Sequence, residues 1–144
     1  MTRRGEVRAA FLTQLQALPG LVSVDDSVPS KFDDELELPR IQVVTYEERV
    51  IDRTLRGPGR RRLRVDVLSY VAGTETTVQT QLDAAAAQVE AAVPRVLGAG
   101  SDFLADLDTT TVEIDTSGSN GPRQRLDRGN AVGRVILRYF VEYT

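Results

Sequence analysis

The side chains on which most enzyme chemistry depends are missing from this chain of 144 residues. It contains no cysteine and no histidine, so thiolate nucleophiles, imidazole bases and the usual zinc ligand sets are excluded. Its serines therefore have no histidine with which to form a catalytic triad. The remaining acid–base groups on strand-like segments are the carboxylates Glu47, Glu48, Asp66, Glu113 and Asp115.

A pair of these carboxylates would suit glycoside hydrolysis. The chain has no tryptophan and only four tyrosines and four phenylalanines, so no aromatic sugar platform accompanies them. The glycine-containing segment at 98–101 lacks the lysine and the preceding strand of a phosphate-binding loop. We therefore predict that the protein is not an enzyme, with no catalytic residue and no cofactor.

An acidic segment at 25–37 is the only candidate for a metal site. Hard cations prefer carboxylate oxygens, but the glycine and spacing of an EF-hand loop are absent. A solvated loop, or a patch facing arginine on a partner, is the favoured interpretation. Its carboxylates are Asp25, Asp26, Asp33, Asp34, Glu35 and Glu37.

Composition and charge describe an ordinary globular chain, which we expect to form one domain over residues 1–144. There is no apolar run of the ~20 residues that a membrane helix needs and no signal-peptide pattern, so no membrane partner is predicted. The formal net charge is −3, which gives no reason to expect specific binding of nucleic acid.

The elements that position the charged groups centre on a long hairpin at 38–72. Two β-prone arms flank the break at 57–59, with an apolar base and a charged tip. Folding about Pro58 brings acidic residues of the first arm near arginines of the second, and opposite charges across strands support pairing. These residues are Glu47, Glu48 and Asp52, facing Arg60, Arg62 and Arg64.

Helices are predicted at 4–18 and at 75–96 from apolar residues at helical spacing, with Thr74 or Thr76 capping the second and Pro94 ending it. A short extra helix is expected at 101–107. Further strands are expected at 21–24, 109–116 and 131–144, the last of them central in its sheet because both faces carry apolar residues. The fold class is therefore α+β, a mostly antiparallel or mixed sheet with two main helices packed on one face.

A long polar segment at 117–130 separates the last two strands. Loops of this length without structure are functional or disordered. Its three arginines, Arg123, Arg125 and Arg128, are candidates for contact with a partner or nucleic acid, with a solvated loop as the alternative.

The order of these elements resembles the tail terminator family of long-tailed bacteriophages, the tail-completion or minor tail protein U-like proteins. The segments that carry the resemblance are MTRRGEVRAAFLTQL, LPRIQVVTYEER, RRLRVDVLSYVAG, TQLDAAAAQVEAAV and NAVGRVILRYFVEYT. The likeness is one of pattern and order over nearly the whole chain. It implies an α+β subunit of a hexameric ring at the head-proximal end of the tail.

The resemblance implies a structural virion protein, assembled in the host cytoplasm, whose partners are further copies of itself, the tail-tube protein and the head–tail connector. Its ring stops tube polymerisation and provides the head-joining surface. Heterologous contacts between charged edges would close such a ring, Glu47, Glu48 and Asp52 meeting arginines 60–64 or 123–128 of a neighbour. A head–tail connector or neck protein, a small ligand-binding domain and a nucleic-acid accessory protein are the alternatives.

Overall fold

A computed structural model describes residues 2–19, 23–26, 39–52, 59–97, 103–115 and 130–144. Their helices and strands follow in the order α1 (Arg3–Gln16), β1 (Ser23–Asp25), β2 (Arg40–Asp52), β3 (Arg60–Thr74), α2 (Val78–Ala92), β4 (Val96–Leu97), β5 (Phe103–Asp115) and β6 (Asn130–Tyr143). The strands form one sheet in the order β1-β2-β3-β6-β5-β4. Only β1 and β2 pair in parallel; the other neighbours are antiparallel.

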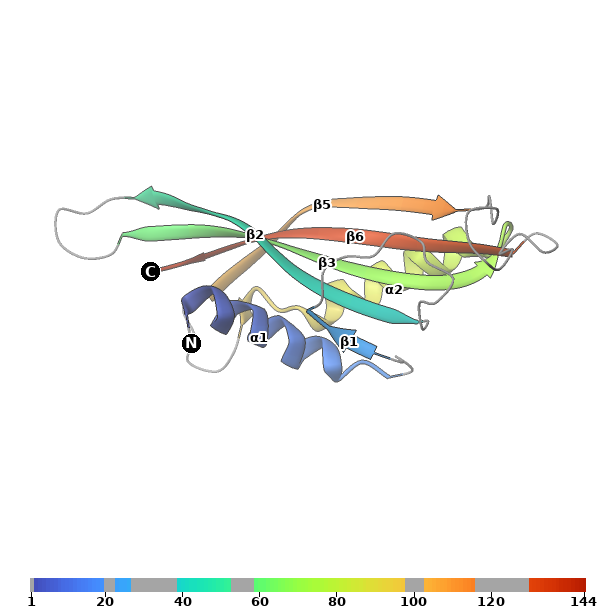
Figure 1. Cartoon of the computed structure of the whole chain (residues 1–144), viewed down its shortest axis with the longest axis horizontal. Helices are drawn as coiled ribbons and strands as arrows, with labels where there is room; N and C mark the ends of the chain where they lie inside the picture. The colour runs from blue at the N-terminus through green and yellow to red at the C-terminus, as the bar shows by residue number, and fades with distance from the viewer. Residues whose placement is uncertain (1, 20–22, 27–38, 53–58, 98–102, 116–129) are drawn as a thin grey trace.

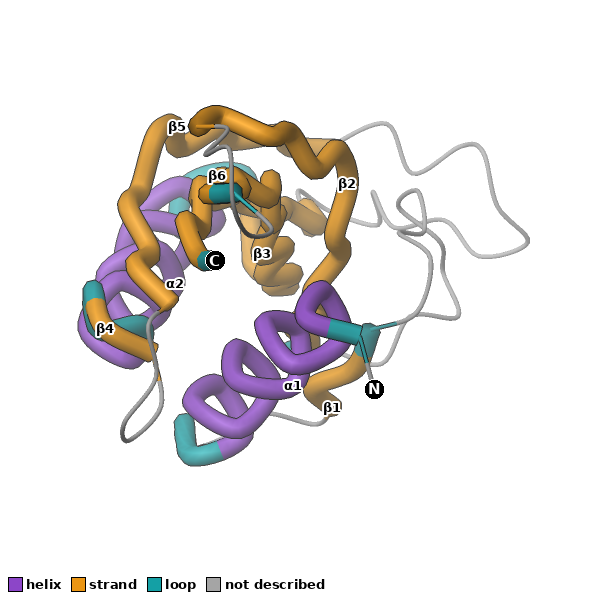
Figure 2. The backbone as a smooth tube through the Cα atoms, turned by 90° about the vertical axis from the view of Figure 1, so that its left-hand side faces the viewer, coloured by secondary structure: helices purple, strands orange, loops and turns teal. Residues whose placement is uncertain are grey.

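The terminal strand β6 lies between β3 and β5, in the middle of the sheet, as its two-sided apolar pattern predicts. Its side chains Val135, Leu137 and Val141 are completely buried on the face that meets the helices. The predicted α+β class, with a mixed sheet, a long hairpin and two main helices, is confirmed. The sheet is curled, with α1 along the bottom and α2 on the left in Figure 2.

The hairpin is formed by β2 and β3 and extends beyond both helices, at the left of Figure 1. We call its far part, residues 46–52 of β2 and 60–64 of β3, the hairpin arm. Gly59 lies just before β3 with φ of 73°, in the left-handed region that only glycine adopts without steric cost.

Helix α1 begins where the Thr2 hydroxyl accepts a hydrogen bond from the backbone N–H of Gly5 at 3.0 Å. One stripe, Val7, Phe11 and Leu15, is completely buried. Phe11 meets Tyr139 of β6 edge to face, with ring centroids 5.4 Å apart. Burial raises the pKa of Tyr139 to about 12.

Helix α2 packs on the same face of the sheet through Val78, Leu82 and Val89. It comes close enough to β6 that a Cβ added at Gly133 would lie 2.6 Å from the Leu82 Cδ1 atom. The helix ends at Ala92, two residues before Pro94, because the residue preceding proline avoids the α conformation. Thr77, not Thr74 or Thr76, holds the N-cap position.

The expected short helix at 101–107 is wrong over its described residues, because β5 begins at Phe103. Phe103 and Ala105 are buried whereas Asp106 is exposed, which is an alternating pattern. Pairing with β6 on one side and with β4 on the other decides the conformation, since context often overrides propensity in strands.

Candidate assembly surface

A β-bulge divides the acidic residues of the hairpin arm between the two faces of the sheet. Thr45 pairs with Val65 and Glu48 with Leu63, so Tyr46 and Glu47 together stand opposite Arg64 alone. The extra residue moves Glu48 onto the face of Leu63, which is the face that the helices cover. Glu47 remains with Arg64 on the opposite face, which we call the helix-free face.

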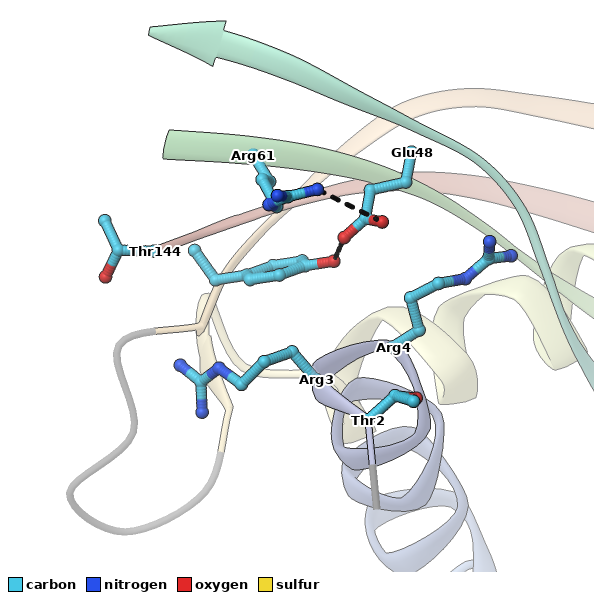
Figure 3. Close-up of a pocket in the computed structure, with 7 residues that line it drawn as sticks. Thr2, Arg3, Arg4, Glu48, Arg61 and Thr144 are labelled. Atoms are coloured by element: carbon cyan, nitrogen blue, oxygen red, sulfur yellow. Dashed lines mark hydrogen bonds and ion pairs between the residues drawn. The ribbon is translucent and has the colours of Figure 1, made fainter. Parts of the chain in front are cut away.

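On the helix side, Glu48 binds one residue of β3 and one residue of β6. It accepts a short hydrogen bond from the hydroxyl of Tyr143, and Arg61 lies 3.7 Å away (Figure 3). Burial, and then the hydrogen bond to Glu48, raise the pKa of Tyr143 above its ordinary value. A cavity of about 450 Å³ opens beside them, and Arg3 and Arg4 at the start of α1 also line it.

Ion pairs cross the strands on the helix-free face of the arm. Glu142 of β6 lies 3.5 Å from Arg60 and 3.0 Å from Arg62. Asp66 is the only buried carboxylate among the described residues, and it accepts hydrogen bonds from Arg64 at 2.8 and 3.2 Å and from Arg138 at 3.3 Å. These charge pairs therefore link β3 to β6 across the helix-free face.

Further along the same face, Arg134 of β6 reaches to both neighbouring strands. Its guanidinium lies 2.6 Å from a carboxylate oxygen of Glu113 on β5 and donates to the hydroxyl of Tyr70 on β3 at 3.3 Å. These contacts continue the row of arginine pairs across the sheet.

Glu47 and Glu48 do not form the predicted ion pairs with Arg60, Arg62 and Arg64. Glu47 pairs instead with Arg49 at 2.9 Å, both side chains being well exposed. The backbone register does place Asp52 opposite Arg60. The loop arginines Arg123, Arg125 and Arg128 lie outside the described residues.

Sequence reasoning did not select Glu142, Asp66 or Arg138 as members of this surface. Part of this surface could have been recognised in the sequence, because Arg134, Arg138 and Glu142 recur four residues apart along one face of the last strand. The partners of Arg138 and Glu142 on β3 are more than 70 positions away in sequence, and no local pattern identifies them.

Two carboxylates of the acidic segment are described, and each pairs within the chain. Asp25 accepts two hydrogen bonds from Arg40, at 2.9 and 3.2 Å, and Asp26 lies 3.4 Å from Arg8. The rest of that segment, residues 27–37, lies outside the described part. Over the described ranges no group of three or more acidic residues is placed to hold a metal ion.

No protein-family model matches this chain, and no curated protein matches its sequence. Among the described helices, none has the length and apolar character required to cross a membrane.

Acid should weaken the arm at Glu142. Hydrogen bonding from Arg62 lowers the pKa of this carboxyl in the folded protein. The stabilisation by Glu142 is therefore present above the pKa of the unfolded state, about 4.3, and is lost as pH falls through the lower pKa of the folded state. We expect Glu142→Gln to lose roughly 0.2–1 kcal/mol at pH 7 and to approach wild type below pH 4. Denaturant unfolding at both pH values is the measurement; an equal loss at both would contradict this origin.

Proposed function

We propose that this protein is a structural virion protein, the tail terminator of a long-tailed bacteriophage. It would form a ring, expected to be a hexamer, at the head-proximal end of the tail tube, stop polymerisation of the tube and provide the surface for head joining. Its partners would be further copies of the chain, the tail-tube protein and the head–tail connector.

The observation that supports this proposal best is the hairpin arm. It extends past both helices and exposes Tyr46, Val50 and Ile51 by 37–41%. A strand pair of this kind is suited to contact with another protein, because it presents backbone and apolar surface away from its own core. Its charges are mostly engaged in pairs that stabilise the arm, as a rigid contact surface requires.

The test is assembly with and without tail tubes. We expect analytical ultracentrifugation to show a closed oligomer, or a monomer that becomes a ring on adding tubes assembled from tail-tube protein, and electron microscopy to show caps at one tube end. Tube growth should stop on addition. A strict monomer that leaves tube length unchanged would sink the proposal.

A head–tail connector or neck protein is the nearest alternative, because its subunits share the same pattern of elements. The same experiment separates the two: a neck protein would bind the connector or an already terminated tail and leave naked tube ends unoccupied.

Charge reversal on the arm must be designed around the pairs described above. Arg64 binds the buried Asp66, so reversal there would disturb folding as well as assembly. Arg49 is a cleaner position, because its pair with Glu47 is exposed and such pairs contribute ~0–1 kcal/mol.

A further inference from the structure

Two strands of the sheet have long free edges among the described residues. β1 pairs with β2 only at Arg40–Gln42, and β4 pairs with β5 only at 103–104. The remainder of each strand is paired on one side only, β2 with β3 and β5 with β6. Such edges present unpaired backbone N–H and C=O groups that a further strand is able to use.

Exposed apolar side chains concentrate on these two edges. Of the seven large apolar side chains exposed in the described part of the chain, six lie on them, three on each strand. They are Tyr46, Val50 and Ile51 on β2 and Leu107, Val112 and Ile114 on β5. Single exposed apolar residues are ordinary, but the concentration of six of them on two unpaired edges indicates surfaces that another protein covers.

The two edges carry opposite charge. β5 contains four acidic residues and no basic one over 103–115. The hairpin arm has five arginines against three acidic residues. Seven consecutive β5 residues, 106–112, are exposed, so the carboxylates of Asp106 and Asp108 face solvent.

Two hollows on the helix-free face repeat this division. The hollow beside the arm measures about 210 Å³ and is lined by Arg49, Arg62, Arg64 and Arg138, with Glu47 as its one acid. The hollow beside β5 measures about 270 Å³ and is lined by Asp106, Asp108 and Glu142, with Arg62 as its one base. One flank of the sheet is thus basic and the other acidic.

We propose that the acidic edge of β5 in one subunit binds the basic hairpin arm of a second copy of this chain, along the free edge of β2. Strand direction alternates from β2 through β3 and β6 to β5. A second copy that continues the sheet in the same orientation therefore sets its β2 antiparallel to β5. The contact is head to tail, which is the kind that generates rings when the rotation closes.

This inference rests on the proposed function, because it assigns the subunit contact of the ring. The proposed contact requires the two flanks of the subunit to be complementary in charge, whereas ring formation as such does not. Like charges brought together at an interface oppose association strongly.

The experiment uses two full-length variants. The arm variant carries Arg49→Glu and Arg62→Glu and so has two acidic flanks; the edge variant carries Asp106→Arg and Asp108→Arg and has two basic flanks. Each is compared with wild type by thermal unfolding, and Arg49→Glu alone replaces the arm variant if that variant is unstable. Oligomers are then measured by analytical ultracentrifugation, with and without tail tubes.

We expect each variant alone to self-associate at least about tenfold more weakly than wild type. An equimolar mixture should restore rings in which the variants alternate, since each acidic flank then meets a basic one. Folded variants that form rings separately would overturn this contact and leave the proposed function standing. If wild type neither assembles nor caps tubes, the proposed function is overturned. If the mixture of the two variants also fails to associate, the contact between β5 and the hairpin arm is overturned as well.

Discussion

Gly133→Ala should destabilise the protein by about 1–3 kcal/mol, because the added methyl group overpacks the contact between α2 and the sheet. The added Cβ would lie 2.6 Å from Leu82 Cδ1 and 3.0 Å from Val78 Cγ2. Both side chains are buried between α2 and the sheet, with exposed fractions of 0–1%, so neither moves aside freely. Equilibrium denaturant unfolding measures the loss.

A double-mutant cycle with Leu82→Ala identifies the cause. Leu82→Ala alone should cost about 2–5 kcal/mol, because it leaves a cavity. In the double variant, the methyl group that Gly133→Ala adds partly fills that cavity, so the total loss should be close to the loss for Leu82→Ala alone. Additive losses would show that Gly133 is required for another reason.

Gly73→Ala is the matched control on the neighbouring strand. Its Cβ would meet the amide oxygen at the end of the Gln81 side chain. Gln81 is exposed and flexible and is able to swing away, so we expect a change within about 0.5 kcal/mol.

Replacing both Arg64 and Arg138 by methionine should cost about 3–5 kcal/mol. The two arginines supply the hydrogen bonds to Asp66, whose side chain is only 5% exposed. Without them a buried carboxylate is left without a compensating charge. Adding Asp66→Leu to this background should recover most of the loss, because an apolar group tolerates the same site.

The Glu47–Arg49 pair provides the exposed control. Its side chains are 69% and 74% exposed, so Arg49→Met should cost no more than about 1 kcal/mol. A small loss in the double methionine variant would mean that solvent reaches the Asp66 carboxylate.

Much of the fold follows from local pattern. Helical spacing of Val7, Phe11 and Leu15 predicts α1, and Pro94 limits α2. The hairpin follows from two β-prone arms about a glycine-containing break, and the central place of β6 from apolar residues on both its faces. These features depend on neighbours within a few residues, which is the range over which sequence periodicity is informative.

The surface of the arm depended on tertiary structure. The alternation of side chains between the two faces of a strand predicts that Glu48 lies on the same face as Arg62 and Arg64 of β3. One extra residue at Tyr46–Glu47 reverses the faces beyond it. The partners of Arg60 and Arg62 come from a strand about 80 residues later, at Glu142. Neither feature leaves a mark in the local sequence.

The amino-acid sequence by itself determined which chemistry is absent, because a chain without cysteine and histidine lacks thiolate and imidazole whatever its fold. It also determined that charge gathers at the tip of a long hairpin. Only the tertiary structure decided which edges of the sheet stay free and which charges face one another, because strand order and register join residues that are far apart in the chain.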